Sequence, residues 1–246
     1  MVCGQQLDER RLAMSRRHYN GRTYIEWLKS LECVFYAPMN QEDDLRDLFS
    51  GVTGVVPSAN THCSVSWDSA LQMYVIDNQG PYYAGLWWDN LNMFPDAVDG
   101  STLARYIPKT VLCTFRFVTN PSSNYYNIGI GLGAEDNGET RNVSVGASRQ
   151  VGEYTSPYIS FNLRQGTTAK IGFVRNGNSF YLIKDGNWYS QNDNDLFTQT
   201  YYSRFGKRVI LGAMAVNNGP RTHCAVKDVY VFSTALDLQT IREIQG

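Results

Sequence analysis

Two pairs of adjacent aromatic residues suggest the chemistry that this chain could perform. They lie in the segment GPYYAGLWWDN, whose candidate binding residues are Tyr82, Tyr83, Trp87, Trp88, Asp89 and Asn90. Sugar rings present apolar C–H faces that stack on aromatic rings, while a carboxylate and an amide can hydrogen-bond to hydroxyl groups. The segment therefore predicts a carbohydrate-binding surface.

The exposure of those rings depends on the element that carries them. If the segment is a strand, one member of each pair must face away from the core, whereas a loop could expose all four rings. The alternative interpretation is that the rings fill a core, cover the edge of a sheet or join subunits. Weaker copies of the pattern occur at Tyr125-Tyr126 and Tyr201-Tyr202.

Composition restricts the class of protein. The chain has 246 residues, a net charge of −1, 13% aromatic residues and abundant Gly and Asn. This balance favours an all-β domain with many turns, and the near-neutral charge predicts no nucleic-acid partner. No apolar run approaches the roughly 20 residues that span a bilayer, so we expect no membrane insertion.

The two ends of the chain carry the helical patterns. We interpret residues 1–31 as an N-terminal arm and a short helix, with Tyr24, Leu28 and Leu31 at helical spacing. This part is either a brace against the main domain or an oligomerisation or attachment element. A second short helix is predicted after Asp237, which can cap it.

Residues 32–246 read as one β domain made of short strands separated by turn signals. The segment IGFVRNGNSFYLIKDGNWYS predicts a meander. Its turns are expected at Asn176-Gly177 and Asp185-Gly186, because both pairs can adopt the positive φ angles of a type I′ turn. We interpret the residues of this segment as scaffold.

The order of these pieces resembles a known superfamily. The segment AKIGFVRNGNSFYLIKDGNWYS resembles the hairpin of laminin-G-like and pentraxin-like domains, and CAVKDVYVFSTALDLQTIREI resembles their closing strand and helix. The resemblance covers roughly residues 31–246. It implies a concanavalin A-like jelly roll of two stacked antiparallel sheets, a fold that serves lectins, adhesion modules, glucanases and passive spacers.

The resemblance also implies a calcium site. Pentraxins bind calcium through an Asp-Asn pair and a later acidic run, and Asp136 and Asn137 lie at a position like the first half. The second half reads GAMAVNNGPRT and has no carboxylate. Since calcium prefers six to eight oxygen ligands, we expect at most weak calcium binding, with a solvated polar loop as the alternative.

The tripeptide Thr-His-Cys occurs twice, at Thr61–Cys63 and Thr222–Cys224. In jelly rolls of this superfamily the terminal strands often pair, which implies that Cys63 and Cys224 lie close together and could form a disulfide. A zinc site of two His and two Cys is disfavoured, because neighbours on a strand point to opposite faces. The alternative is free, buried thiols.

A glucanase-type strand motif of paired carboxylates is missing from the sequence. A retaining glycosidase needs two carboxyl groups about 5–5.5 Å apart on one face, and Glu135, Asp136 and Glu139 lie instead in a Gly/Asn-rich turn. The sequence therefore favours a non-catalytic, lectin-like carbohydrate-binding or adhesion module with a glycan or polysaccharide as partner. The alternatives are a structural or protein-interaction module of a larger assembly such as a phage virion and, less favoured, a polysaccharide hydrolase or lyase.

The N-terminus carries four Arg within its first 20 residues and lacks the apolar stretch of a secretory signal. We therefore expect cytoplasmic synthesis, with release as part of a particle. An assembly of this kind would use residues 1–31 for a homo-oligomer or another partner.

Overall fold

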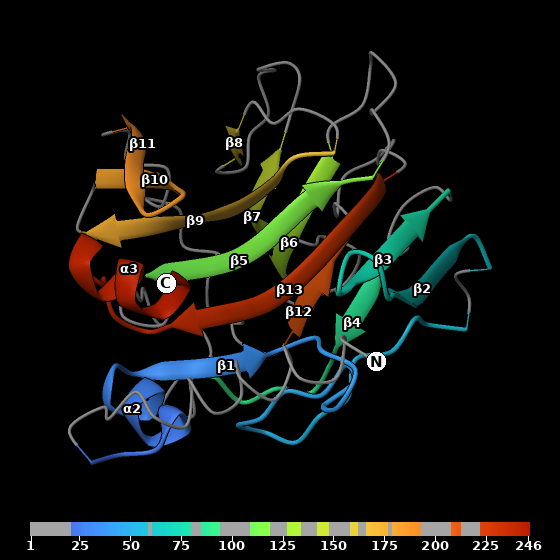
Figure 1. The fold of residues 1–246 in the computed structure, drawn as a ribbon, viewed down its shortest axis with the longest axis horizontal. Coiled ribbons are helices and arrows are strands. Elements are labelled where there is room, and N and C mark those ends of the chain that lie inside the picture. Colours follow the sequence, from blue (N-terminus) through green and yellow to red (C-terminus); the bar gives the residue numbers. More distant parts are fainter. Residues whose placement is uncertain are drawn as a thin grey trace, which may run out of the picture.

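A computed structural model of the chain describes eleven segments, and all structural statements concern them. The described residues are 21–58, 61–79, 85–93, 109–118, 127–133, 142–147, 158–161, 166–176, 179–192, 208–212 and 222–246. They form two β-sheets stacked face to face and two short helices (Figure 1). The predicted all-β, two-sheet sandwich with a helix near each end is confirmed.

The larger sheet has eight strands in the order β11-β10-β9-β5-β13-β3-β2, and β1 pairs beside β13. All of its described pairings are antiparallel. The strands are β1 (Cys33–Ala37), β2 (Cys63–Asp68), β3 (Met73–Asn78), β5 (Thr110–Phe117), β9 (Thr168–Asn176), β10 (Ser179–Lys184), β11 (Asn187–Asn192) and β13 (Thr222–Phe232).

A bulge in β13 lets two strands share one of its sides. The register shifts between Lys227 and Tyr230, and Asp228 adopts a φ of 52° there. This left-handed conformation suits Asp better than most residues. Before the bulge β13 pairs with β3, and after it with β1.

The smaller sheet has five strands in the order β4-β12-β6-β7-β8. They are β4 (Leu86–Trp88), β6 (Asn127–Gly133), β7 (Asn142–Ala147), β8 (Tyr158–Phe161) and β12 (Arg208–Leu211). The pairing of β7 with β8 is parallel, a departure from the purely antiparallel sandwich that the sequence predicted.

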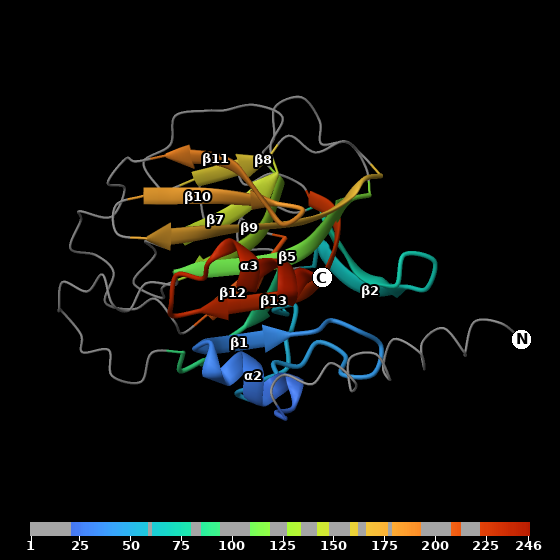
Figure 2. The same cartoon turned by 60° about the vertical axis from the view of Figure 1, so that its left-hand side comes forward.

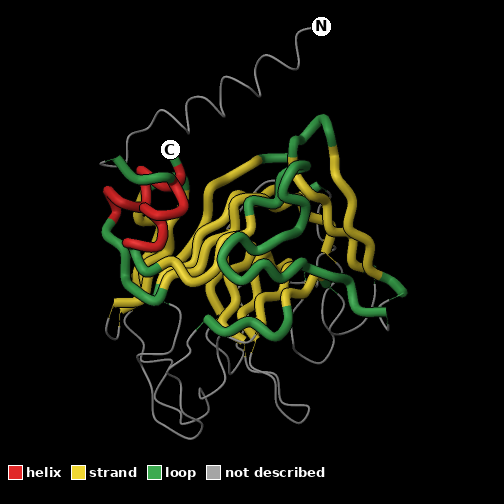
Figure 3. Tube along the Cα trace, turned by 90° about the horizontal axis from the view of Figure 1, so that it is seen from below, coloured by secondary structure: helices red, strands yellow, loops and turns green. Residues whose placement is uncertain are grey.

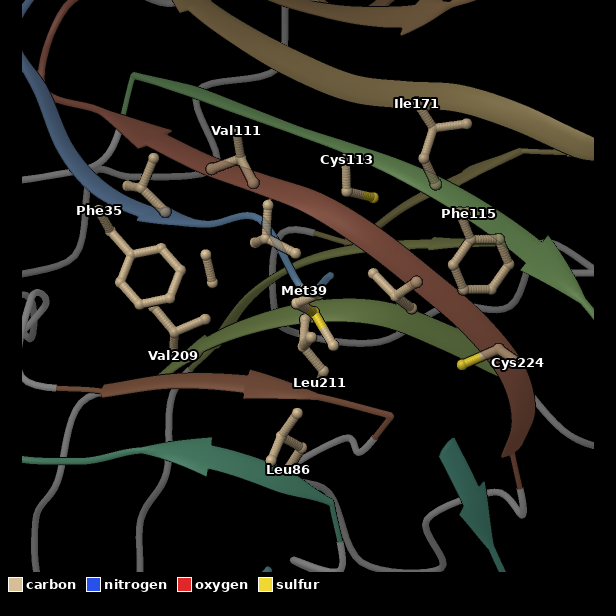
Figure 4. Close-up of a cluster of buried hydrophobic side chains, with 14 of the residues drawn as sticks. Phe35, Met39, Leu86, Val111, Cys113, Phe115, Ile171, Val209, Leu211 and Cys224 are labelled. Atoms are coloured by element: carbon tan, nitrogen blue, oxygen red, sulfur yellow. The ribbon is translucent and has the colours of Figure 1, made fainter. Parts of the chain in front are cut away.

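The main core lies between the two sheets. In Figure 4, side chains from β1, β5, β9 and β13 meet those of β4 and β12. Val111, Cys113 and Phe115 of β5 alternate toward this core, because successive strand residues point to opposite faces. Full burial of side chains of this size contributes about 1.5–3 kcal/mol each.

A second core covers the outer face of the larger sheet, where both helices pack. These are α2 (Tyr24–Ser30) and α3 (Leu238–Gln245), which lie on the same side of the strands in Figure 3. Leu28, Ile241 and Ile244 are buried there against Leu112 and other residues of the sheet. The sheet is therefore buried on both faces at its centre.

Local signals begin both helices. Thr23 and Glu26 form a reciprocal capping box at the start of α2, and the Asp237 carboxylate accepts the Thr240 N–H (2.8 Å) at the start of α3. Both predicted helices are confirmed. Residues 1–20 of the predicted arm lie outside the described residues, and a domain boundary at residue 31 stays a prediction.

The two predicted turns have different outcomes. Asp185 and Gly186 have φ angles of 50° and 70° and connect the paired residues Lys184 and Asn187, as a type I′ turn requires. The prediction at Asn176-Gly177 is wrong by one residue. Asn176 still belongs to β9 and pairs with Ser179, so it is not a central residue of the turn, and Gly177 lies outside the described residues.

Among the described helices, neither has the length and apolar character that crossing a membrane requires.

Candidate functional site

The predicted sugar-binding segment contains β4, and its second tryptophan is a core residue. Trp88 is fully buried, its ring meets the Phe35 ring edge to face at 5.4 Å, and its Nε1–H donates to the Leu45 carbonyl at 2.6 Å. A sugar cannot reach a ring in this position. The prediction of Trp88 as a binding residue is therefore corrected, because strand alternation turns it toward the sandwich interior.

A loop encloses Trp88 from the other side. A Cβ atom on Gly54 would lie only 2.7 Å from Cε2 of Trp88, so glycine is needed at this close approach. Asp47 is fully buried in the same loop and accepts hydrogen bonds from the backbone N–H groups of Tyr36 (2.9 Å), Phe49 (3.2 Å) and Ser50 (2.9 Å). This polar cluster serves to hold the loop against the core.

The described residues do not place the remaining predicted binding residues on one common surface. Trp87 faces away from the core and is partly buried, and its backbone pairs with Val55. Asp89 is partly buried, and Asn90 is exposed with a φ of 57°. Tyr82 and Tyr83 lie outside the described residues. A role in binding for Trp87, Asp89 and Asn90 stays a prediction.

The predicted calcium ligands, Asp136 and Asn137, also lie outside the described residues. Within the described segments no group of three or more His, Cys, Asp or Glu side chains could hold a metal ion. Calcium binding therefore stays a prediction that depends on residues 134–140.

The two Thr-His-Cys repeats lie on opposite sides of one strand. Cys63 of β2 is aligned with Asn78 of β3, and Cys224 of β13 is aligned with Ile76 of the same strand. Two strand spacings separate them by more than about 9 Å, whereas a disulfide needs Cα atoms about 4.4–6.8 Å apart. Both cysteines are free, so the predicted pairing is wrong: β13 lies in the interior of its sheet.

The buried thiols have no reactive character. Burial raises the pKa of Cys63 to about 11 and raises the pKa values of Cys113 and Cys224 further. A thiol reacts as its thiolate, which these environments disfavour. The interpretation as free, buried cysteines is confirmed for Cys33, Cys113 and Cys224, while Cys63 is free and only partly buried.

Contacts among three tyrosines hold α2 against the larger sheet. The Tyr36 and Tyr230 rings stack at 4.5 Å, and the hydroxyls of Tyr24 and Tyr230 are hydrogen-bonded at 2.9 Å. Burial raises the pKa values of Tyr36 and Tyr230 well above the ordinary value. Burial also raises the pKa of the nearby Asp228, against the opposing effect of Lys227 and Lys170. The two stacked rings are too deeply covered to contact a ligand.

An aromatic pair with one exposed ring lies elsewhere, on β10 and β11 at the edge of the larger sheet. Trp188 is 45% exposed, and its ring centroid lies 4.7 Å from that of Tyr181, with the planes tilted by 45°. Tyr181 packs on the helix-covered core, and Trp188 is aligned with Ile183 of that core. The pair therefore lies on the helix-covered outer face of the sheet, and Figure 2 shows β11, with β10 beside it, at the border of that sheet. We call Tyr181 and Trp188 the aromatic platform.

Arg242 of α3 fixes the turn that lies between Tyr181 and Trp188. Arg242 donates from Nε to the Gly186 carbonyl (2.6 Å) and from Nη2 to Oδ1 of Asn187 (3.0 Å). Asn187 in turn donates from Nδ2 to the Asp185 carbonyl (3.0 Å). Exposed polar and cationic groups thus stand beside Trp188 on a turn with a fixed shape.

Trp188 was missed by the sequence reasoning, which treated its segment as scaffold. A local signal was present, since Trp188 comes two residues after Gly186 of the predicted turn. The position of β11 at the sheet edge, which leaves the ring uncovered, depends on contacts with distant segments.

Comparison with known proteins shows the fold. No protein-family model and no curated protein sequence matches the chain. A mutant of Trypanosoma rangeli sialidase with trans-sialidase activity has a TM-score of 0.53 at 11% identity, over 87% of this chain and 32% of that chain. The binding domain of botulinum neurotoxin DC, in complex with rat synaptotagmin II, has a TM-score of 0.54 at 11% identity, over 87% and 51%.

A third similar structure is the binding domain of botulinum neurotoxin serotype D, with a TM-score of 0.51 at 13% identity, over 87% of this chain and 50% of that chain. At these identities the similarity shows the β-sandwich fold alone. The chain spans about a third of the sialidase and about half of the toxin chains. Membership of the laminin-G-like or pentraxin-like group stays a prediction.

Proposed function

We propose that the chain is a non-catalytic, lectin-like carbohydrate-binding module and that the aromatic platform is its contact surface. The observation that carries the proposal is the 45% exposure of Trp188 on a hairpin fixed by Arg242. Tyr181 supports the indole ring from below the surface, so the exposed ring is held in one orientation. A rigid platform binds with a smaller loss of conformational entropy than a mobile one.

The surroundings of the platform fit a sugar. An aromatic ring stacks on the apolar C–H face of a pyranose, and hydroxyl groups at the ring edge need hydrogen-bond partners. Asn187 and Arg242 are exposed beside Trp188 and can supply them. The nearby Asp185 carboxylate accepts the Lys170 N–H at 2.9 Å, a structural contact across the hairpin.

Two fold neighbours are described with bound partners. One is a Trypanosoma rangeli sialidase in complex with sialic acid, and the other is the toxin binding domain in complex with rat synaptotagmin II. They support a binding role through the fold only. The activity of the sialidase is not carried over, because this chain spans about a third of it.

A glycan-array screen of the full-length protein, followed by calorimetry on any positive glycan, tests the proposal. We expect Trp188→Ala to weaken binding by about tenfold, since an aromatic contact contributes about 0.5–1.5 kcal/mol beyond its buried area and 1.4 kcal/mol corresponds to about tenfold. Trp188→Phe keeps an aromatic ring and should retain most of the affinity.

Val55→Ala is the matched control, because Val55 is the other exposed large hydrophobic side chain among the described residues (55%). Equal affinities for Trp188→Ala and Val55→Ala would contradict the proposal. Loss of binding in Trp87→Ala alone would instead place the site at the segment of Trp87, Asp89 and Asn90. Repeating the screen with chelator tests calcium, since loss of binding would support Asp136 and Asn137 as ligands.

The second candidate is a structural or protein-interaction module attached through residues 1–31. The anchoring of α2 by Tyr24 and Leu28 favours it, because an arm that precedes α2 starts from a fixed point on the sheet. Removing residues 1–20 leaves α2 intact. Loss of an oligomer or assembly in that variant, together with a negative glycan screen, would favour this candidate.

A further inference from the structure

Strand β2 is a border strand of the larger sheet. Its hydrogen bonds with β3 determine which of its backbone groups point outward. The Gln79 N–H donates to the His62 carbonyl at 2.8 Å, so this pair belongs to the hydrogen-bonded set of the β2–β3 ladder. In an antiparallel ladder the hydrogen-bonded pairs alternate along the strand. The N–H and C=O groups of Cys63, Val65 and Trp67 therefore point away from β3.

The outward side of β2 pairs with no other described strand, and Figure 1 shows it at the border of the sheet. Natural edge strands are usually blunted by Lys, Pro or a bulge. The segment CSVSW contains no charge and no proline, and the β2–β3 register has no shift. At the opposite border the β10–β11 register does shift. The described residues therefore leave the outward side of β2 open to pairing.

The two faces of β2 have different character. Cys63, Val65 and Trp67 pack against the main core and remain only partly buried, whereas Ser64 and Ser66 are exposed on the other face. A strand added to this edge must continue both faces, apolar inside and small and polar outside. The sequence of β2 itself has this pattern.

We propose that β2 pairs antiparallel with β2 of a second copy of this chain, about a two-fold axis at Val65. In this register Val65 faces Val65, Cys63 faces Trp67, and Ser64 faces Ser66. Each of the three residues with outward N–H and C=O groups then meets another such residue, so all of these groups pair. Axes at other residues leave part of this set without a partner.

Complementary polar groups support the second copy as the partner. The same register places His62 of one copy opposite Asp68 of the other. His62 is exposed, and Asp68 uses Oδ1 to accept the N–H groups of Ala70 (2.8 Å) and Leu71 (3.0 Å), which leaves Oδ2 for a cross-strand contact. The imidazole of His62 can donate a hydrogen bond to this carboxylate, and polar pairs directly across two strands stabilise a ladder. The two strands carry no like charges in opposition.

Analytical ultracentrifugation of the full-length protein between about 1 and 200 µM tests this inference, which does not depend on glycan binding. We expect a reversible dimer. Val65→Pro removes an N–H that points away from β3, so it leaves the β2–β3 hydrogen bonds intact, and edge strands tolerate proline. It should raise the dimer dissociation constant by roughly tenfold to a hundredfold, through two lost hydrogen bonds.

Val65→Ala is the matched control, because it trims the side chain but keeps the N–H and should leave a dimer. A wild-type protein that is monomeric throughout this range would overturn the inference. So would a Val65→Pro protein that dimerises as well as Val65→Ala, since the interface would then lie elsewhere.

Cross-linking tests the register itself. Ser64 and Ser66 of opposite copies form a pair without main-chain hydrogen bonds, whose Cα atoms lie about 4.5 Å apart, within disulfide range. The double variant Ser64→Cys/Ser66→Cys should give a covalent dimer on oxidation. Ser66→Cys alone and the wild type, which carries Cys63, should not. Equal cross-linking in the single variant would overturn this register.

Discussion

Trp88 and Trp188 both lie on border strands, yet their surroundings are opposite. Trp88 belongs to β4 at the border of the smaller sheet, faces the main core and is fully buried beneath the loop that contains Gly54. Trp188 belongs to β11 at the border of the larger sheet, faces outward and is 45% exposed. An aromatic pair in the sequence thus indicates a strand. The face on which each ring lies, and the residues that cover it, decide whether a ligand can reach it.

Truncating the two rings should give the largest contrast in stability. Trp88→Ala is expected to lower the free energy of unfolding by about 3–5 kcal/mol, because it leaves a cavity in the core. Trp188→Ala should lower it by only about 0.5–1.5 kcal/mol, because the ring is 45% exposed and loses mainly its contact with Tyr181. Denaturant titration measures both. Similar losses for the two variants would contradict the difference in burial between Trp88 and Trp188.

Adding one carbon to the loop over Trp88 should have the next largest effect. In Gly54→Ala the new Cβ would lie 2.7 Å from Cε2 of Trp88 and 3.0 Å from Cδ1 of Leu86. Overpacking of this kind costs about 1–3 kcal/mol. Val55→Ala, at the exposed neighbouring position, should stay within about 0.5 kcal/mol in the same titration. A neutral Gly54→Ala would show that the loop is not fixed against the ring.

The smallest expected effect on stability is that of Asp228. Its carboxyl lies in the covered part of the outer face, unlike the exposed Trp188. Burial raises the pKa of its carboxyl above the ordinary 3.8, so the folded state holds this proton more tightly than the unfolded chain. The contribution of Asp228 to stability therefore falls as the pH rises from 3.8 through the raised pKa. Asp228→Asn removes this loss and still tolerates the positive φ.

Thermal unfolding at about pH 4 and pH 8 measures that difference. The stability of Asp228→Asn relative to the wild type should increase between the two values. A variant that is less stable than the wild type at pH 8 would show that the ionised carboxylate is stabilised by Lys227 and Lys170 more than it is opposed by burial.

Features fixed by short-range interactions could be predicted from the sequence. The type I′ turn at Asp185 and Gly186 needs two residues that tolerate positive φ, and the helix caps at Thr23 and Asp237 each need one side chain three residues from its partner. Alternation likewise required Trp87 and Trp88 to face opposite sides of a strand. These signals lie within a few residues of the structure that they specify.

Features fixed by strand order could not be predicted in this way. The distance between Cys63 and Cys224 depends on β3 lying between their strands, and the sequence does not state that order. Alternation also leaves open which of two neighbouring tryptophans faces the core. The exposure of Trp188 follows from β11 being a border strand beyond the helices, which is a property of the whole sheet.

The most direct test of Trp188 as the contact residue is a heteronuclear NMR titration that follows the indole N–H signals of the five tryptophans. Single Trp→Phe variants assign the signals, and a glycan from the array screen is the ligand. If the aromatic platform binds the glycan, the Trp188 signal shifts on titration and the Trp88 signal stays in place. A shift of the Trp87 signal with an unchanged Trp188 signal would contradict Trp188 as the contact residue.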